Sequence, residues 1–339
     1  MTLAVGTMLN RRTLLQGATG VAAVTMGMPA IAAGPTSLRV GFLHGLAADA
    51  QLWVAEHLGS FKEQGLAIET IQFVTGLEAF QALAGGSLDL VTTGAVISNF
   101  PARGQGKAFL INSEEFGLAQ IWVHPAAGIR SVADLKGRQV ATSRGTTGHY
   151  FLYRVMLANG LDPAKDVEIV HQQMGNAVTA FIAGAVPVVA TWKPFDVAIG
   201  RSSPDAVKLA DATQFPDASV LTGWSASNEL HATDKDLLRR FVRAWLPANE
   251  ALATHPAETL PMLQADRYKD FTLTELQEYY DGIHWRSAKE WLREFRDGEV
   301  AKLLNQVTNF NVAMGAFSDP LPAEIYFDPS LLEDVLAQG

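Results

Sequence analysis

The fold is decided by the stretch SRGTTGHY at residues 143–150. A short apolar run at residues 139–142 precedes it and has the composition of a strand. Residues 150–159 follow it, and their apolar side chains recur at helical spacing. We therefore interpret the stretch as a strand-to-helix turn, where free N–H groups, the positive helix end and two threonine hydroxyls favour an anion. A plain helix cap uses the same residue types, so the rest of the chain has to distinguish the two.

Composition limits the class of protein. The chain has 339 residues, of which 48% are hydrophobic and 18% charged, as in a globular protein of about two domains. Its formal net charge of -9 argues against a nucleic-acid partner, because nucleic acids bind basic surfaces. No apolar run of membrane-spanning length follows the N-terminal segment. The chain has no cysteine, which excludes disulfides, thiolate metal sites and a lipid anchor on cysteine.

The N-terminus has three features of an export signal. NRRTLL at residues 10–15 is a twin-arginine pattern, and an apolar stretch rich in Gly and Ala follows at residues 17–28. PAIA at residues 29–32 then supplies an A-x-A cleavage site. We predict a twin-arginine signal peptide over residues 1–32, cleaved near Ala32, and a mature protein that is free in the periplasm.

Strands and helices alternate in two series, at residues 38–92 and at about 129–210. Such βαβ patterns predict parallel sheets with right-handed crossovers. A crossover at about 115–125 connects the two series, a strand at 220–225 returns to the first, and helices fill the remainder. The sequence thus predicts an α/β protein of two lobes, with two parallel-dominated sheets, two hinge strands and C-terminal helices.

The predicted lobes have definite bounds. Lobe I is discontinuous and combines residues 36–120 with residues 220–339, while lobe II spans residues 121–219. In the C-terminal part we expect a long helix over residues 234–254, kinked or split at Pro247.

Ligands of open parallel sheets bind beyond the carboxyl ends of the strands. With two facing lobes, the strand-end loops of both should line one cleft. These loops are His44–Gly45, Thr75–Gly76, Thr93–Gly94, Glu114–Glu115, Ser143–His149, Met174–Gly175 and Trp192–Asp196.

Several motifs along this layout occur together in a known family. They are TGLEAFQALAGGSLD at residues 75–89, SVADLKGRQVA at 131–141, GTTGHY at 145–150 and TWKPF at 191–195. By the order and spacing of these motifs, the chain resembles periplasmic substrate-binding proteins of ABC importers. Within that family it resembles the sulfonate/taurine/nitrate-like branch, which also contains thiamine-pyrimidine-synthase-like proteins. The resemblance covers Leu38 to the C-terminus. Two positions depart from it: Pro187 stands where Asp is usual, and Lys193 where an acid is common.

The resemblance implies the two-lobed type II fold of periplasmic binding proteins. It also implies a non-enzymatic solute-binding component that closes by hinge motion on a small organic anion, such as an aliphatic sulfonate or taurine. The expected partners are the small-molecule solute and an ABC permease in the inner membrane. We expect a monomer with no cofactor, no bound metal and no nucleic-acid partner.

The candidate ligand-binding residues come from the turn and from the other strand ends. The resemblance implies that Thr146, Thr147 and the following amides hold the anion, with Ser143 adding a hydroxyl. His149 either donates to the anion or buttresses the turn, and Trp192 is an apolar wall or packs under the hinge. An acid near the cleft would pair with an ammonium group of the solute, or would simply be solvated. The complete set is Ser143, Gly145, Thr146, Thr147, His149, Trp192, His44, Thr75, Gly76, Thr93, Gly94, Glu114 and Asp196.

Other functions on the same fold stay open. The solute could instead be nitrate, an aromatic acid or a thiamine-precursor pyrimidine. A pyrimidine-precursor enzyme or a sensor would use the same cleft, although the sequence shows no catalytic motif and no metal-ligand spacing.

Overall fold

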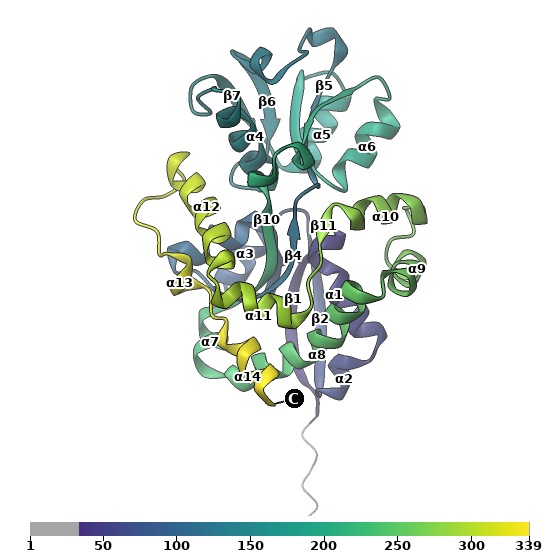
Figure 1. The fold of residues 1–339 in the computed structure, drawn as a ribbon, viewed down its shortest axis with the longest axis vertical. Coiled ribbons are helices and arrows are strands. Elements are labelled where there is room, and N and C mark those ends of the chain that lie inside the picture. The colour runs from purple at the N-terminus through teal and green to yellow at the C-terminus, as the bar shows by residue number, and fades with distance from the viewer. Residues whose placement is uncertain (1–33, 339) are drawn as a thin grey trace, which may run out of the picture. The chain divides into compact units, whose positions relative to one another are not determined.

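Two mixed β-sheets organise residues 34–338, the part of the chain that the computed structural model describes. The strands are β1 Thr36–Leu43, β2 Leu66–Phe73, β3 Leu90–Thr93, β4 Lys107–Glu115, β5 Ala119–Val123, β6 Arg138–Thr142, β7 Val167–His171, β8 Val188–Trp192, β9 Val207–Asp211, β10 Val220–Ala226 and β11 Ile283–His284. Sheet A has the order β11-β4-β10-β3-β1-β2, and sheet B has the order β7-β6-β8-β5-β9 (Figure 1).

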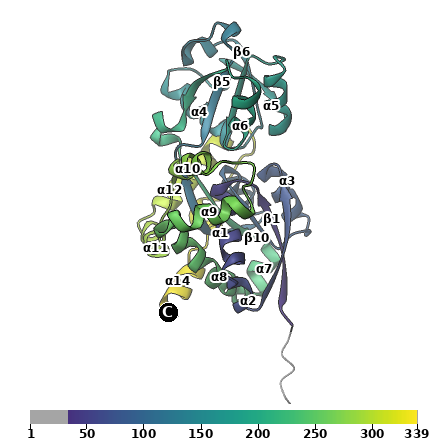
Figure 2. The same cartoon turned by 90° about the vertical axis from the view of Figure 1, so that its right-hand side faces the viewer.

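Helices cover both sheets and dominate the C-terminal third of the chain. They are α1 Leu46–His57, α2 Ser60–Glu63, α3 Gly76–Ala84, α4 Thr147–Ala158, α5 Met174–Ile182, α6 Phe195–Ser202, α7 Asn228–Thr233, α8 Lys235–Thr254, α9 Pro256–Asp266, α10 Leu273–Asp281, α11 Ala288–Arg296, α12 Glu299–Ala313, α13 Ala323–Tyr326 and α14 Ser330–Gln338. Figures 1 and 2 show α4, α5 and α6 beside sheet B and the later helices beside sheet A.

Strand directions follow from the path of the chain. In sheet A, β1 pairs in parallel with β2 and β3, whereas β10 is antiparallel to both β3 and β4. In sheet B, β6 pairs in parallel with β7 and β8, whereas β5 is antiparallel to β8 and β9. The predicted α/β class is confirmed. Both sheets are mixed because β5 and β10, the first strands after each crossing between the sheets, run against their neighbours.

We name the two parts by their sheets. The sheet B half is residues 119–219, and the sheet A half is residues 35–118 and 220–338. Each has its own apolar core, with Trp224, Phe241 and Trp245 buried in the first core and Phe151, Leu152 and Val188 in the second. The described residues from 35 onward together form one compact unit. The lobe boundaries at residues 120 and 220 therefore remain a prediction.

Some elements differ from the sequence-based expectation. Helix α8 is continuous through Pro247 instead of splitting there. A proline has no N–H to donate to the carbonyl one turn earlier, but because Pro247 is exposed, that unpaired carbonyl lies on the solvent side of the helix. The sequence of residues 131–137 also predicts a short capped helix, and the structure has a 3₁₀ turn there, Val132–Leu135. Helix α6, strand β9 and helix α13 were not predicted, because their apolar residues are too few or too irregular to show a period. Helix α14 was not predicted either, although Leu331, Leu332 and Val335 recur at helical spacing along it.

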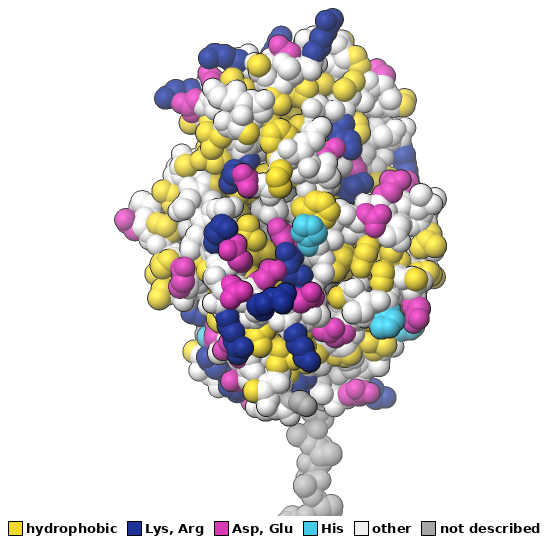
Figure 3. Space-filling view, viewed as in Figure 1, with side chains coloured by type: hydrophobic (Ala, Val, Ile, Leu, Met, Phe, Trp, Pro, Cys, Tyr) yellow, Lys and Arg dark blue, Asp and Glu magenta, His cyan; other side chains and the backbone are white. Residues whose placement is uncertain are grey.

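The predicted signal peptide and its cleavage site lie outside the described residues. Within residues 34–338, no helix is long and apolar enough to cross a membrane. On the face shown in Figure 3, Lys and Arg side chains are interspersed with Asp and Glu, so the described residues form no continuous basic area on that face.

Candidate functional site

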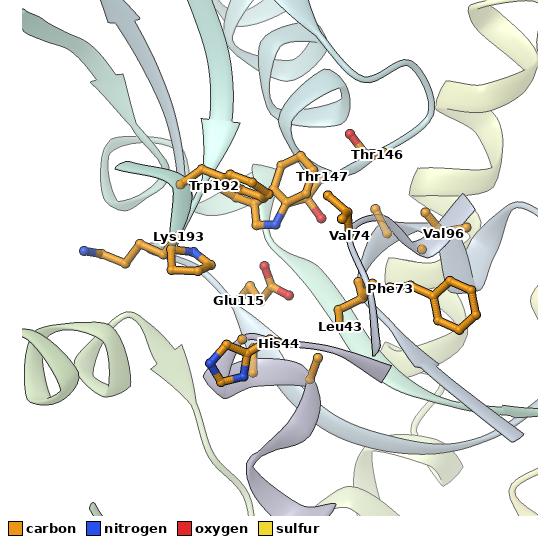
Figure 4. Close-up of a pocket in the computed structure, with 18 of the residues that line it drawn as sticks. Leu43, His44, Phe73, Val74, Val96, Glu115, Thr146, Thr147, Trp192 and Lys193 are labelled. Atoms are coloured by element: carbon orange, nitrogen blue, oxygen red, sulfur yellow. The ribbon is translucent and has the colours of Figure 1, made fainter. Parts of the chain in front are cut away.

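A cavity of about 270 Å³ lies where loops from both halves meet (Figure 4). Its volume is near the lower end of the usual range for small-molecule pockets, roughly 300–1,000 Å³, which suits a small solute. Most of the lining is apolar. The lining residues are Leu43, His44, Gly45, Ala47, Ala48, Gln72, Phe73, Val74, Gly76, Gly94, Ala95, Val96, Glu115, Thr146, Thr147, Trp192, Lys193, Pro194, Phe195 and Tyr279.

The turn between β6 and α4 brings a helix start to this cavity. Gly145 has a φ of 76°, a left-handed conformation that glycine adopts without strain. The Thr146 hydroxyl donates to the carbonyl of Ser143 at 2.6 Å, which holds the turn together. The first helical bond runs from the Tyr150 N–H to the Thr146 carbonyl at 2.9 Å. The preceding N–H groups of α4 therefore have no partner within the helix, and they can bind an anion beside the Thr147 hydroxyl.

His149 supports the turn from behind. Its Nδ1 accepts the Gly145 N–H at 3.0 Å, its ring meets Phe310 edge to face, and the residue is only 3% exposed. Burial lowers the pKa of His149 to about 4, so the imidazole is neutral at neutral pH. Of the two predicted roles, this geometry favours the buttress over direct contact with a ligand.

Aromatic side chains form one wall. The rings of Trp192 and Phe195 meet edge to face with centroids 5.3 Å apart, and both line the cavity. The Tyr279 hydroxyl donates to the Lys193 carbonyl at 3.1 Å, so α10 of the sheet A half is tied to the loop after β8. The Lys193 ammonium pairs with Asp196 at 3.0 Å and extends away from the other labelled residues in Figure 4.

Glu115 brings a buried carboxyl into the lining. The residue is 8% exposed and accepts a hydrogen bond from the Thr222 hydroxyl. Burial raises the pKa of Glu115 to about 7. Figure 4 shows the carboxyl among the lining residues, between Thr147 of the sheet B half and His44 of the sheet A half.

His44 is held at the cavity by a buried aspartate. Its Nδ1 lies 3.0 Å from Asp49 Oδ2, and Asp49 also accepts hydrogen bonds from the Trp53 indole at 2.8 Å and from the Tyr268 hydroxyl. Burial lowers the pKa of His44, but the hydrogen bond to Asp49 and its negative charge outweigh burial, and the pKa lies above the ordinary value. His44 thus adds positive charge as pH falls, although Asp49 offsets that charge locally.

The structure brings only part of the predicted set to the cavity surface. The predicted residues in the lining are His44, Gly76, Gly94, Thr146, Thr147 and Trp192. Ser143, Gly145 and His149 lie one layer behind and build the turn. Thr75 and Thr93 are buried next to the lining glycines, outside the lining itself.

Two predicted acids are outside the lining for a clear reason. Glu114 points to the other side of β4, where it binds Arg286 at 2.6 Å and His284 at 3.2 Å. Asp196 is held by Lys193 at 3.0 Å and by the Gln120 amide at 3.1 Å. Side chains alternate across a strand, so Glu115 faces the cavity where Glu114 cannot.

Sequence reasoning placed the Glu114–Glu115 loop at the cleft but chose Glu114 of the two as the candidate residue, and it missed Tyr279. Strand β4 is buried almost throughout, so its hydrophobic pattern did not reveal which of two adjacent glutamates faces the ligand. Tyr279 lies on α10, far along the chain and outside the strand-end loops. Its only signal would have been an aromatic residue on a helix with a buried face, which is common in cores.

Hydrogen bonds cross between the halves around the cavity. Besides Tyr279 to Lys193, the Gln173 amide donates to Glu78 at 2.7 Å, and Arg201 donates to the Asp270 carbonyl at 3.0 Å. Within residues 34–338, no group of three or more His, Asp and Glu side chains could hold a metal ion. The arrangement can therefore enclose a small molecule and offer it one helix start, hydroxyls, a buried carboxyl and aromatic walls.

Two sheets with a solute-sized cavity between them define the class as the periplasmic-binding-protein fold, which solved structures share. Residues 48–259 match the family described as NMT1/THI5 like, and the chain belongs to this family. A protein of Brucella abortus named as a binding protein is 25% identical over 291 residues, which cover 86% of this chain and 89% of the relative. A Bacillus subtilis protein named as an aliphatic sulfonates-binding protein is 31% identical over 169 residues, 47% of this chain and 48% of the relative.

Similar solved structures include binding proteins and an enzyme. One is the alkanesulfonate-binding protein SsuA from Xanthomonas axonopodis pv. citri, bound to MOPS, with a TM-score of 0.67 and 21% sequence identity. The match covers 86% of this chain and 98% of the SsuA chain. Another is the desulfurization enzyme DszB, with a TM-score of 0.62 and 15% sequence identity. This match covers 90% of this chain and 99% of the DszB chain. At these identities the likeness shows the fold alone.

Proposed function

We propose that this protein is the solute-binding component of an ABC importer and captures a small organic anion, of the aliphatic sulfonate or taurine type, in the cavity. The observation that carries the proposal is the start of α4, whose Thr147 hydroxyl and unpaired N–H groups border the cavity. The sulfonate-binding names of the Bacillus subtilis relative and of the similar SsuA structure support the same solute class.

In this proposal each part of the lining has a task. Thr147 and the first N–H groups of α4 bind the anionic head, while the Thr146 hydroxyl stays within the turn. Trp192 and Phe195 cover the apolar body of the solute. The two halves close around it by hinge motion at the two crossings between the sheets. Ser143, Gly145, His149, Thr75 and Thr93 position these groups from behind.

The wider setting is part of the same proposal. The protein would act as a monomer in the periplasm, after twin-arginine export, and would deliver its solute to an inner-membrane ABC permease. A relative from Brachyspira hyodysenteriae, whose name describes an ABC transporter periplasmic binding protein, supports this setting. Nitrate, an aromatic acid or a thiamine-precursor pyrimidine are the alternative solutes.

An enzymatic role is the second candidate, because the desulfurization enzyme DszB shares the fold. A catalytic site requires a nucleophile next to a base, or a metal. The hydroxyls of Thr146 and Thr222 are bound to a carbonyl and to Glu115, and His149 faces the turn. Binding without catalysis is therefore the role that we propose.

Replacing Thr147 by valine tests the anion site. Valine keeps the shape but removes the hydroxyl, so affinity for the sulfonate that binds should fall by about 1.5–3 kcal/mol, the range for a hydrogen bond to a charged group. Isothermal titration calorimetry with 1-butanesulfonate, benzenesulfonate and taurine, in a buffer free of sulfonates, measures the change.

The matched control is Thr179→Val on α5, where the hydroxyl donates to the Gly175 carbonyl on the exposed side of the helix. That variant should bind as the wild type does. An unchanged affinity in Thr147→Val would remove the start of α4 from the site.

A further inference from the structure

Glu115 is an acidic side chain in the cavity lining to which the proposed function gives no task. It lines the cavity, it is 8% exposed, and no Lys, Arg or His of residues 34–338 forms an ion pair with it. A carboxylate held in such surroundings without a counter-charge is strongly unfavourable. When a ligand fills the remaining space and excludes water, the negative charge of Glu115 must therefore be neutralised by a proton or by the ligand.

Glu115 and Thr147 border the same point of the lining. A Cβ added to Gly94 would lie 3.2 Å from Glu115 Oε1 and 3.1 Å from Thr147 Oγ1. Thr222 Oγ1, which donates to Glu115, would lie 3.4 Å from that Cβ. An anionic group seated on Thr147 beside Gly94 is therefore within reach of Glu115 as well. The Glu115 carboxyl therefore contacts the anionic group of the solute and not the opposite end of the solute molecule.

The charged groups around Glu115 do not neutralise it. His44, after β1, is paired with Asp49 at 3.0 Å, and Lys193, after β8, is paired with Asp196 at 3.0 Å. Tyr279 of α10 uses its hydroxyl on the Lys193 carbonyl. Thr222 of β10 supplies one hydrogen bond, and the start of α4 supplies only partial positive charge, which the anion itself would use.

We propose that Glu115 receives the anionic group as the neutral carboxylic acid, so that capture of the solute takes up one proton from solvent. This inference rests on the proposed function. Oε1 continues to accept from Thr222, and the proton on Oε2 is donated to the anion beside the Thr147 hydroxyl. The proton stays on Glu115 while the solute is bound, and no bond of the solute breaks. The structure thereby assigns Glu115 as the residue that selects the charge of the solute.

The direction of the pH dependence follows. Burial raises the pKa of Glu115 to about 7, so the free protein holds both acid and carboxylate near neutrality. A bound anion stabilises the acid further. Because the acid is the form that binds, affinity is full below about pH 7 and falls as pH rises through that value.

Calorimetry measures proton uptake in pairs of sulfonate-free buffers that differ in ionisation enthalpy, Tris and triethanolamine at about pH 8 and Bis-Tris and imidazole at about pH 6. The probes are 1-butanesulfonate, benzenesulfonate and taurine. At about pH 8 we expect uptake of close to one proton per bound anion and, at about pH 6, almost none. The dissociation constant should rise about tenfold between these pH values, as expected for a group with its pKa midway.

Two variants sharpen the test. Glu115→Gln keeps an N–H donor of similar shape, so it should bind the anion without the proton uptake and the pH dependence that Glu115 contributes. Any smaller pH dependence that remains belongs to His44, which also lines the cavity. Glu168→Gln, an exposed carboxyl on β7, is the control and should keep both uptake and pH dependence. Thermal unfolding of each free variant confirms that it is folded.

The outcomes separate this inference from the proposed function. Binding of a probe anion without proton uptake at about pH 8 would overturn the role of Glu115 and leave the proposed function standing. Affinity that rises with pH and is lost in Glu115→Gln would also overturn it, and would mean that ionised Glu115 pairs with a cationic group of the solute. Failure of every probe to bind would overturn both.

Discussion

Replacing Asn112 by leucine is expected to destabilise the protein by about 3–5 kcal/mol. Asn112 is fully buried on β4, and its Oδ1 accepts the indole N–H groups of both Trp224 and Trp245 at 2.8 Å. Its amide nitrogen donates to the Ala48 carbonyl at 2.9 Å and to the Thr92 hydroxyl at 3.2 Å. Leucine has a similar volume but leaves two indole N–H groups buried without an acceptor, and each such loss costs about 1–3 kcal/mol.

Urea unfolding followed by circular dichroism measures the effect of Asn112→Leu. The control is Asn159→Ala at the exposed end of α4, whose amide donates only to the Val155 carbonyl. It should cost less than about 1 kcal/mol. A free energy of unfolding for Asn112→Leu within about 1 kcal/mol of the wild type would show that the network around β4 does not hold the sheet A half together.

Gly148→Ala should displace the start of α4 and weaken both stability and anion binding. A Cβ at this position would lie 2.7 Å from the Ala190 carbonyl oxygen and 3.2 Å from Thr191 Cα, both backbone atoms of β8. Because backbone atoms cannot rotate aside as a side chain can, α4 must move away from β8. We expect this shift to lower the free energy of unfolding by about 1–3 kcal/mol. Thr147 moves with it, so we expect at least a tenfold loss of affinity, about 1.4 kcal/mol.

Gly175→Ala is the matched control because Gly175 also lies in the first turn of a helix, α5, with no atom within 4 Å of its added Cβ. Alanine restricts the unfolded chain and favours the helix, so this variant should be more stable by about 0.5–1 kcal/mol. Thermal unfolding and calorimetry on both variants give the comparison. Equal stability and equal affinity in the two variants would contradict the close contact between α4 and β8.

The sequence predicted the fold well because local signals and topology agree. The alternation of strands and helices, and the glycine-rich turn before α4, are properties of short segments that a single chain displays. The turn also predicted which residues would reach the cavity from the sheet B half, namely Thr146 and Thr147. Strand ends similarly predicted His44, Gly76 and Gly94.

The remaining features depend on contacts between distant segments. The choice between Glu114 and Glu115 is set by the side of β4 that Arg286 occupies, and Arg286 comes 171 residues later than Glu115. Tyr279 reaches the cavity because α10 packs across the loop after β8. The hydroxyl of Thr146 is unavailable because it closes its own turn onto Ser143, which depends on exact backbone geometry. None of these has a period or motif that could reveal it beforehand.

Capture of an anion in this cavity is tested most directly by a thermal-shift panel on the ligand-free protein. The panel contains alkanesulfonates, aromatic sulfonates and carboxylates, taurine, nitrate, pyrimidines and simple alkylammonium ions, all in a sulfonate-free buffer. We predict a rise in melting temperature for at least one class of organic anion, corresponding to about 4 kcal/mol at roughly 1,000-fold excess over the dissociation constant. If no anion in the panel raises the melting temperature, or if only the alkylammonium ions raise it, the proposal that the cavity captures an organic anion would be contradicted.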